Sequence, residues 1–421
     1  MKTVNFYTLG CKVNMYETEA MKKLFIGAGY TVTGKDDADV FVINTCTVTA
    51  MSDRKSRQMI RRAKHKNPNS IVVVAGCFSQ VSQKQAEEMP EADIIVGTYG
   101  RKDIVKYVEN YKGKKMNCVY DEIPAVFEEM PSESQSRTRA VIKIQDGCRN
   151  FCSYCIIPYA RGPLRSRGID EIIKEVTMLT KKGYKEFVFV GINLACYNYD
   201  GLKLGDVIEK VCEIDGVKRV RLGSLEPNVF TEKFLKTVKN QPKLCKHFHI
   251  SLQSGCNETL KRMNRHYTSE HYLSYLEKIR EVCPDVNFTT DVMVGFAGET
   301  EEEFNESIQT VKKAGFGSIH VFPYSVRKGT AAEKMDNHVD NETKTKRAEI
   351  MTKTGEQLTR CKLEGFIGQT VEVLFETEKD GIFEGFTDSY IKVRAKGENL
   401  FGEIVSVTVT GAEKDFLTGE I

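Results

Sequence analysis

Short β-branched apolar runs alternate with amphipathic stretches over the first 110 residues of the chain. The apolar runs have the length of buried strands, and the stretches between them show the three-to-four-residue spacing of helices. This alternation predicts an α/β domain over residues 1–112, with a parallel sheet and helices on both of its faces. The predicted strands are residues 4–9, 40–44, 71–75 and 94–96, and the predicted helices include residues 15–28 and 51–65.

A polar segment separates this region from a second alternation. Residues 113–116 are polar, and residues 128–138 are acidic, rich in Ser and interrupted by Pro131, so residues 113–138 are interpreted as a linker. Strand-like runs with intervening helices resume in residues 139–365 and predict an open (β/α)6 barrel, with a doubly wound sheet as the alternative. The runs lie near residues 140–144, 187–190, 220–222, 248–252, 288–293 and 319–322, and residues 342–364 are predicted to form one long polar helix.

The pattern changes again in residues 366–421, where apolar and polar positions alternate between turns rich in Gly and Asp. A period of two is typical of strands with one buried face. The alternating runs, residues 371–375, 382–386, 391–395 and 404–410, predict a small antiparallel β-barrel, a kind of module that often holds RNA. The chain as a whole is therefore expected to be an α/β multidomain protein.

The composition is that of a globular protein, with 41% hydrophobic and 28% charged residues. Lys and Arg total 61 against 58 Asp and Glu, a net charge of +3, so a nucleic-acid site has to be a local patch. No apolar run reaches the length of a membrane span, and the N-terminus lacks the features of a signal peptide. We therefore expect a cytoplasmic protein without a membrane segment.

The cysteines carry the clearest sign of chemistry. An odd number, 13, in a chain without an export signal favours metal or redox chemistry over a disulfide framework. Cys148, Cys152 and Cys155 lie in a C-x3-C-x2-C spacing just after the first strand of the predicted barrel. Three thiolates can hold three irons of a cubane cluster and leave the fourth iron open for a ligand. The alternatives are a zinc site with three cysteines and three unrelated loop cysteines.

This central triad, Tyr154 before its last cysteine and the barrel behind it resemble the radical S-adenosylmethionine (SAM) enzymes. The resemblance implies a 4Fe-4S cluster whose open iron binds SAM, and a deoxyadenosyl radical formed from that cofactor. Barrel sites are built at the carboxyl ends of strands, although a turn or a helix cap is the alternative for each residue there. The residues expected to contact the cofactor are Tyr154, Gly191, Asn193, Ser224, Glu226, Ser251, Gln253, Val294 and Pro323.

A second set of cysteines, Cys11, Cys46 and Cys77, is dispersed in the sequence, but each follows a predicted strand. The ends of parallel strands meet at one edge of a sheet, the edge at which ligands bind, so the three thiols are expected to converge. Gly10 and Gly76 each precede a cysteine and would let the backbone turn tightly. The alternative is three buried cysteines that behave as small hydrophobic side chains.

The stretches around these cysteines, residues 8–14, 44–46 and 75–77, resemble the N-terminal domain of the methylthiotransferases. The resemblance implies that Cys11, Cys46 and Cys77 hold a second 4Fe-4S cluster, which carries the sulfur to be inserted. It also implies that the C-terminal barrel is an RNA-binding TRAM module. The resemblance covers nearly the whole chain, in the family's domain order.

The family divides by target into three branches. Two act on adenosine 37 of tRNA, modified with an isopentenyl or a threonylcarbamoyl group, and one acts on an aspartate of a ribosomal protein. Residues 12–14, Lys-Val-Asn, are most similar to the threonylcarbamoyladenosine branch. The isopentenyladenosine branch more often has Gln-Met-Asn at this place, and the ribosomal branch Pro-Lys-Asn.

The resemblance therefore implies transfer of a methylthio group to C2 of N6-threonylcarbamoyladenosine 37 of tRNA. The family's reaction uses two 4Fe-4S clusters and two molecules of SAM, with an electron donor and a sulfur source as further partners. The targets of the other two branches remain alternatives. The most distant alternative is a metal-binding RNA module without enzymatic activity, with zinc in place of iron.

Two groups of basic residues are candidates for contacts with RNA phosphates. Residues 54–66 contain seven Lys or Arg, for which a solvated helix face is the alternative. Arg161, Arg165 and Arg167 follow the central triad with no acidic residue among them. Their place at the mouth of the predicted cluster site favours substrate contact, so all three are predicted to bind RNA.

Overall fold

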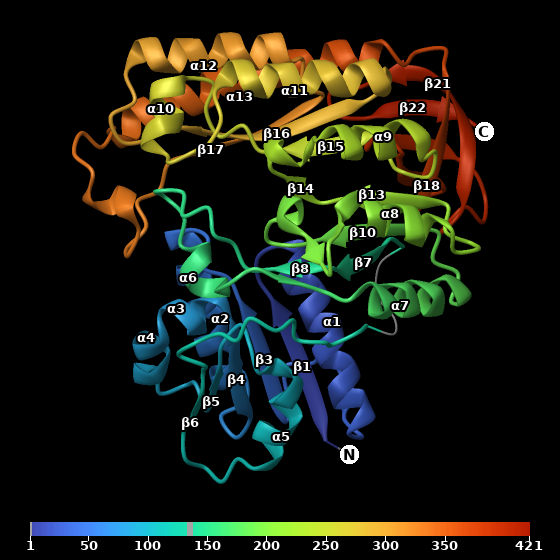
Figure 1. Cartoon of the computed structure of the whole chain (residues 1–421). Coiled ribbons are helices and arrows are strands. Elements are labelled where there is room, and N and C mark those ends of the chain that lie inside the picture. The colour runs from blue at the N-terminus through green and yellow to red at the C-terminus, as the bar shows by residue number, and fades with distance from the viewer. Residues whose placement is uncertain (1, 133–137) are drawn as a thin grey trace.

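A parallel sheet forms the N-terminal part of the computed structural model, which describes residues 2–132 and 138–421 (Figure 1). Its six strands have the order β2-β1-β3-β4-β5-β6. The order reverses between β1 and β3, and such a switch point opens a crevice at the carboxyl edge of a sheet. The strands are β1 (Thr3–Thr8), β2 (Thr31–Val32), β3 (Val40–Thr45), β4 (Ile71–Gly76), β5 (Ile94–Val96) and β6 (Met116–Cys118).

Helices cover both faces of this sheet because its central strands are apolar on both sides. Val40 and Val42 of β3 pack with α1 (Lys12–Gly27) and α5 (Ile104–Glu109). The alternate residues Phe41 and Ile43 face the opposite layer. That layer consists of α2 (Ala50–Lys66), α3 (Cys77–Val81) and α4 (Gln83–Glu88). The predicted parallel α/β arrangement is confirmed.

Strand β6 lies within the segment interpreted as a linker, residues 113–138. It pairs in parallel with β5, and Met130 and Ser132 further along are buried. The linker prediction is therefore wrong at β6, because a three-residue strand at a sheet edge carries too little apolar pattern to be recognised. Residues 133–137 of the predicted linker lie outside the described residues.

The central part is an open barrel of parallel strands in chain order. Two sheets, β13-β10-β7 and β14-β15-β16-β17, are continuous because β13 and β14 are successive segments interrupted only at Gly223. A doubly wound sheet would reverse its strand order, so the (β/α)6 alternative is the correct one. The strands are β7 (Ala140–Lys143), β10 (Glu186–Val190), β13 (Arg219–Leu222), β14 (Ser224–Leu225), β15 (His247–Ile250), β16 (Asn287–Val294) and β17 (Ser318–Pro323).

Amphipathic helices surround the barrel and bury their apolar faces against its strands in one large core. The predicted long polar helix is α13 (Asn341–Glu364). The other main helices are α7 (Ile169–Lys181), α8 (Leu204–Cys212), α9 (Glu232–Asn240), α11 (Ser269–Val282) and α12 (Glu301–Ala314). The short elements are α6 (Ile157–Arg161), α10 (Asn257–Arg262), β8 (Gln145–Asp146), β9 (Arg165–Ser166), β11 (Asn198–Tyr199) and β12 (Leu202–Lys203).

The C-terminal part is a closed five-stranded barrel with the order β18-β19-β20-β22-β21. The four predicted strands are present, and a fifth, β22, closes the barrel by pairing in parallel with β20. A four-residue strand that contains Gly419 shows little alternation, so the sequence pattern did not reveal it. The strands are β18 (Thr370–Lys379), β19 (Ile382–Thr387), β20 (Lys392–Lys396), β21 (Ile404–Ala412) and β22 (Leu417–Glu420).

The three parts are held together by specific contacts. Val13 and Tyr16 of α1 pack against apolar side chains of β7 and β10, which brings the first sheet's carboxyl edge to the open barrel. At the amino ends of the barrel strands, Arg219 and Arg221 donate hydrogen bonds of 2.9 Å to backbone carbonyls of the C-terminal barrel. Among residues 2–132 and 138–421, no helix has both the length and the apolar character needed to cross a membrane.

Candidate active site

All thirteen cysteines are free thiols, and three of them meet at the switch point of the N-terminal sheet. Cys11 follows β1 and caps α1, Cys46 follows β3, and Cys77 begins α3 after β4. Gly10 and Gly76 have φ values of 102° and 103°, in the region that favours glycine. A Cβ on Gly10 would lie 2.9 Å from the Cys46 Sγ atom, so the turn needs glycine for space as well.

The thiols of this N-terminal triad interact electrostatically. Burial raises the pKa of the Cys77 thiol to about 11, against the opposing charge of Arg161 and with smaller contributions from Cys11 and Cys46. Desolvation by the surrounding protein also raises the pKa of Cys11. The predicted convergence is thus present, and the thiols would give up their protons on binding iron.

Asn14 links two of the loops that carry these cysteines. Its Nδ2 atom donates to the carbonyl of Leu9, at 2.8 Å, and to the carbonyl of Thr45, at 2.9 Å. Its Oδ1 atom accepts a 2.6 Å hydrogen bond from Arg161. One buried amide therefore fixes the chain before Cys11 relative to the chain before Cys46, a role that strand-end reasoning did not assign to it.

The central triad occupies the loop between β8 and α6, at the carboxyl end of the barrel. Burial raises the pKa of the Cys155 thiol to about 12, with contributions from Cys152 and Cys148, so these three thiols also converge. The loop is held by a 2.9 Å hydrogen bond from the Cys155 amide to the Cys152 carbonyl. The Asn150 amide donates to the Cys148 sulfur at 3.5 Å.

Arg265 is the functional candidate that sequence reasoning missed here. Its Nη1 atom donates to the Cys152 sulfur at 3.3 Å, its Nη2 atom pairs with Glu226, and its Nε atom donates to the Tyr267 hydroxyl. Nearby, the Tyr267 hydroxyl donates to the carbonyls of Ser251 and Leu252 at the end of β15. Arg265 follows the short helix α10 rather than a strand, so the strand-end rule could not select it.

Apart from Tyr154, which lies in the loop of this triad, the residues predicted to bind SAM lie at or just beyond the carboxyl ends of the barrel strands. The Asn193 side chain is buried, and its Oδ1 atom has no hydrogen-bond partner among the described residues. Gln253 has a φ of 65°, rare for a residue other than glycine and typical of functional sites. Tyr154 packs edge-on against Phe296, with ring centroids 6.3 Å apart. Of the rest, Val294 is buried, Gly191, Glu226 and Ser251 are half-buried, and Ser224 and Pro323 are exposed.

The prediction that Arg161, Arg165 and Arg167 contact RNA needs correction, because all three are buried. Arg161 pairs with Glu17 at 2.6 Å, and Arg165 pairs with Asp146 at 3.2 Å. Arg167 pairs with Glu129 and Glu175. These guanidiniums are occupied by carboxylates that lie elsewhere in the sequence, so they are not available to phosphates in this structure.

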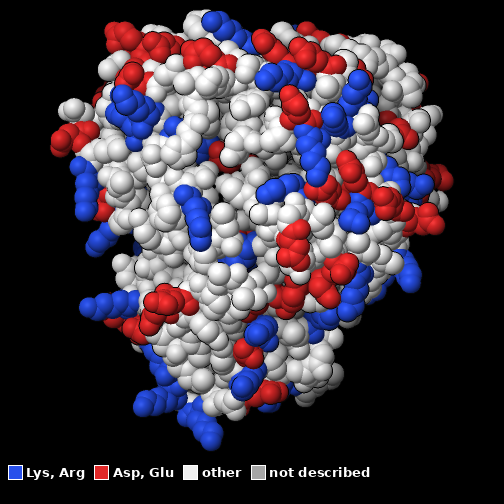
Figure 2. All heavy atoms as spheres, in the orientation of Figure 1, with Lys and Arg blue, Asp and Glu red and all other residues white. Residues whose placement is uncertain are grey.

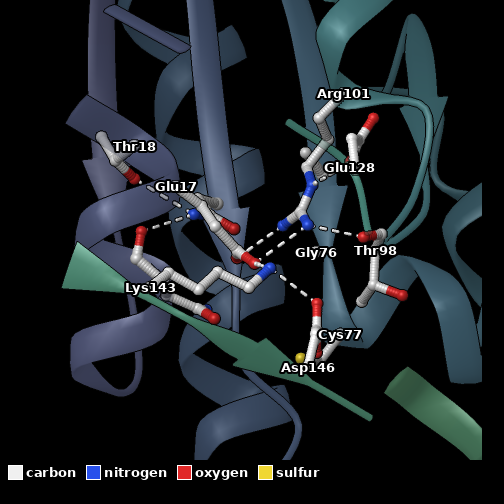
Figure 3. Close-up of polar contacts among 12 residues, drawn as sticks. Glu17, Thr18, Gly76, Cys77, Thr98, Arg101, Glu128, Lys143 and Asp146 are labelled. Carbon is white, nitrogen blue, oxygen red and sulfur yellow. Dashed lines mark hydrogen bonds and ion pairs between the residues drawn. The ribbon is translucent and has the colours of Figure 1, made fainter. Parts of the chain in front are cut away.

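A buried ionic network instead connects the N-terminal triad to the barrel (Figure 3). Glu17 of α1 accepts hydrogen bonds from Arg101, Arg161 and Lys143. Burial alone would raise the pKa of Glu17, but these three cations outweigh it and hold that pKa well below its usual range. Arg161 also donates from Nε to the Cys77 sulfur at 3.2 Å. The segment after the central triad is thereby tied to a sulfur of the other triad.

Both triads suit iron–sulfur clusters. Each offers three thiols, and each has a guanidinium N–H beside one sulfur that can compensate thiolate charge. In the described part of the chain, no three His, Cys, Asp or Glu side chains meet at the spacing of a single metal ion. The orphaned Asn193 oxygen suits a cofactor beside the central triad.

Basic and acidic side chains are interspersed over the face shown in Figure 2. The seven Lys and Arg of residues 54–66 lie on α2, where Arg54, Lys55 and Arg62 are exposed. Other cations of this helix are paired: Lys64 with Asp93 and Lys66 with Asp36. The helix therefore retains a short row of exposed cations rather than a continuous basic surface.

Comparisons with known proteins agree with this architecture. Residues 3–97 match the family described as "Uncharacterized protein family UPF0004", and residues 142–311 match the "Radical SAM superfamily". The chain is 42% identical to "Threonylcarbamoyladenosine tRNA methylthiotransferase MtaB" of Bacillus subtilis (strain 168), over 100% of this chain and 96% of that protein. It is 36% identical to "tRNA-2-methylthio-N(6)-dimethylallyladenosine synthase" of Clostridium novyi (strain NT), over 98% of this chain and 95% of that one.

Among solved structures, the radical SAM methyltransferase TsrM from Kitasatospora setae is similar, with a TM-score of 0.57. The likeness covers 76% of this chain and 73% of that one at 14% sequence identity, so it shows the fold alone. The barrel and the cysteine triad at its carboxyl end define a radical SAM enzyme. Within that class, the full-length relatives identify the chain as a member of the tRNA methylthiotransferase family. The family expected from the cysteine motifs is confirmed, and its cofactors are SAM and 4Fe-4S clusters.

Proposed function

We propose that this enzyme transfers a methylthio group to C2 of N6-threonylcarbamoyladenosine at position 37 of tRNA in the cytoplasm. The observation that carries the proposal is the pair of convergent thiol triads, one at the carboxyl edge of each parallel sheet. It is supported by relatives from three bacteria that are named as threonylcarbamoyladenosine tRNA methylthiotransferases. We further propose that residues 1–112 carry the sulfur, residues 139–365 generate the radical, and residues 366–421 bind RNA.

The proposed roles of the side chains follow from what each one touches. Cys148, Cys152 and Cys155 would hold the cluster that binds SAM, and Cys11, Cys46 and Cys77 would hold the second cluster. When bound, these groups supply the radical that removes the unreactive C2 hydrogen and the methylthio group that replaces it. Arg265 and Arg161 stabilise one thiolate in each triad. At least one cysteine of each triad is buried, which restricts the access of water to reactive species.

The reaction requires partners beyond tRNA. Reductive cleavage of SAM consumes one electron, and each product takes one sulfur atom from the enzyme. We therefore propose an electron donor that reaches the central triad and a sulfur source that restores the N-terminal one.

The main competing substrate is isopentenyladenosine, since several full-length relatives are named for dimethylallyladenosine. Purified enzyme, reconstituted anaerobically, is incubated with SAM, a reductant and tRNA that carries either modified adenosine. Mass spectrometry of the nucleosides is expected to show a methylthio product on threonylcarbamoyladenosine. A product on isopentenyladenosine alone would replace the proposed substrate.

Three cysteine variants test the division of labour in the same assay. Cys46→Ala is expected to abolish methylthio transfer but still cleave SAM to deoxyadenosine, because it removes a thiol of the N-terminal triad only. Cys152→Ala is expected to abolish both reactions. Cys361→Ala removes an exposed thiol of α13 and serves as the control, with both reactions retained. Methylthio transfer by Cys152→Ala would refute the radical mechanism.

A further inference from the structure

The interior of the central barrel is unusually polar on one side. The inward-facing positions of β15 are His247 and His249, and those of β16 are Thr289 and Asp291. Strand β17 contributes His320. The parallel register places His249 beside Thr289 and Asp291 beside His320. Barrel interiors of this kind are ordinarily filled by Val, Ile and Leu. Titratable side chains cost free energy to bury, so their presence here points to a polar ligand.

These side chains line a cavity of about 810 Å³. This volume lies within the range of about 300–1,000 Å³ that is typical of small-molecule sites. Ser224 and Phe322 line it at the carboxyl ends of the strands, near the predicted SAM site, and Phe386 and Tyr390 of the C-terminal barrel line it as well. The cavity is therefore a chamber within the barrel that reaches toward the reaction centre.

Hydrogen bonding within the cavity leaves capacity for a ligand. Thr289 Oγ1 lies 2.9 Å from His247 Nε2 and 3.0 Å from His249 Nδ1, and His249 Nε2 lies 3.2 Å from an Asp291 oxygen. His247 is only 4% exposed, and its Nδ1 atom has no hydrogen-bond partner among the described residues. A buried ring nitrogen without a partner is costly unless a bound molecule or water satisfies it.

Lys12 brings a positive charge to this cavity from the N-terminal part. It directly follows Cys11 in the sequence, and its ammonium nitrogen lies 5.8 Å from the centre of the Tyr390 ring. Arg221, in the same wall, is held in place by Glu186 and by backbone carbonyls of the C-terminal barrel. One wall of the cavity is thus formed by the residue that directly follows a cysteine of the N-terminal triad.

We propose that this cavity receives the N6-threonylcarbamoyl arm of the target adenosine, with Lys12 pairing with its carboxylate. His249, Asp291 and His320 then offer hydrogen-bond partners to the hydroxyl and urea groups of the arm. The inference rests on the proposed function and adds a structural reason for the substrate. An apolar dimethylallyl arm would leave the polar lining without partners, which a site built for hydrogen bonds rejects strongly.

The test compares two RNA stem–loops that differ by one charge. One carries threonylcarbamoyladenosine with its free carboxylate, and the other carries the same group as a neutral methyl ester. The wild-type enzyme is expected to prefer the free acid by at least about tenfold in kcat/KM, since charge-assisted hydrogen bonds discriminate strongly. Lys12→Gln is expected to lose that preference through a raised KM for the acid, so that the acid and the ester become similar substrates.

Two controls separate recognition from damage to the neighbouring triad. Lys210→Gln makes the same chemical change on an exposed lysine of α8 and is expected to keep the wild-type preference. Iron and sulfide content and deoxyadenosine formation are measured for every variant, and both are expected to be normal in Lys12→Gln. An unchanged acid-to-ester ratio in Lys12→Gln would overturn the inference alone. A wild-type enzyme that modifies neither stem–loop would overturn the proposed substrate and the inference together.

Discussion

Each thiol triad receives a hydrogen bond from one arginine whose side chain is almost fully buried. Arg161 donates to Cys77 at 3.2 Å, and Arg265 donates to Cys152 at 3.3 Å. Hydrogen bonds to cluster sulfurs stabilise the more negative, reduced state and are one of the means by which a protein sets a reduction potential. We therefore expect each arginine to tune the reduction potential of the cluster proposed at its own triad.

Arg161→Lys tests this at the N-terminal triad. Lysine keeps a positive charge toward Glu17 but has no Nε–H group to place on the Cys77 sulfur. The potential of the N-terminal cluster is expected to fall by about 60 mV, the one-electron equivalent of a tenfold change in equilibrium. A redox titration followed by electron paramagnetic resonance measures it. Arg265→Lys is the matched variant and is expected to lower the reduction potential of the central cluster instead. A change in the potentials of both clusters by either variant would contradict separate tuning.

Asn14→Ala removes the amide that links the chains before Cys11 and Cys46. The carbonyls of Leu9 and Thr45 and the Arg161 guanidinium are then left without this partner, at a cost of about 1–3 kcal/mol for a buried unsatisfied group. We expect a lower melting temperature and roughly half the iron of the reconstituted protein, because one of two clusters fails to assemble. Iron and sulfide analysis measures the second effect. Asn67→Ala is the control. It removes a side-chain hydrogen bond to the Ala38 carbonyl at the carboxyl end of α2, the end remote from Cys46. Normal iron content in Asn14→Ala would show that this amide is dispensable for the triad.

At the scale of elements, the two triads depend on where strands end and helices begin. Cys11 and Cys77 lie at the amino ends of α1 and α3, where the helix dipole favours a thiolate. Glu17, in the second turn of α1, gathers cations from β7, from α6 and from the turn after β5. Buried ion pairs in this network therefore hold the N-terminal part against the central barrel.

Glu17→Gln tests that network through pH. The pKa of Glu17 is held well below its ordinary value of 4.5 in the folded protein, so the unfolded chain binds a proton first as the pH falls. The stability that Glu17 provides is therefore complete above pH 4.5 and decreases progressively below it. At pH 7 the variant is expected to be less stable by about 3–5 kcal/mol of unfolding free energy, since three buried cations are deprived of a carboxylate.

Chemical denaturation between neutral and acidic pH measures the effect. The difference between wild type and Glu17→Gln is expected to narrow as the pH drops below 4.5. Glu109→Gln, on an exposed position of α5, is the control and is expected to match wild type throughout. A difference that stays constant with pH would mean that the Glu17 charge is not what stabilises the junction.

The sequence was sufficient for the elements with strong periodicity and for sites at strand ends. The apolar runs of β3 and β4 and the cysteine after each strand predicted the sheet and the convergence of the N-terminal triad. It was insufficient where an interaction joins distant positions: nothing near Arg161 in the sequence shows that Glu17 will neutralise it. Arg265 was missed for the same reason, because its contact with Cys152 spans 113 residues of chain.

At the scale of the whole molecule, the cavity proposed to receive the tRNA base is lined by residues of all three parts. The exposed cations Arg54, Lys55 and Arg62 of α2 have no acidic partner among the described residues. The helix starts four residues after Cys46, so a phosphate backbone held along it would pass close to the N-terminal triad. This surface is therefore the remaining candidate for the RNA contact predicted from the basic residues.

Substitution of these three residues together by Gln tests the surface. Affinity for tRNA is expected to fall about tenfold or more at moderate salt, and the slope of log K against log salt to decrease by about one for each phosphate that is no longer neutralised. Filter binding or fluorescence anisotropy over a salt series measures both. Replacement of Lys233, Lys236 and Lys239 on α9 by Gln is the control with the same change in net charge. Equal effects of both triple variants would reduce the role of α2 to general charge.

The central claim is the identity of the reaction and of its substrate. The most direct measurement is mass spectrometry of tRNA nucleosides from a host that lacks its own methylthiotransferases, with and without this gene. The account predicts a methylthio mass shift on threonylcarbamoyladenosine that disappears with Cys46→Ala. A shift on isopentenyladenosine instead, or no shift in cells that contain the folded protein with both clusters, would contradict it.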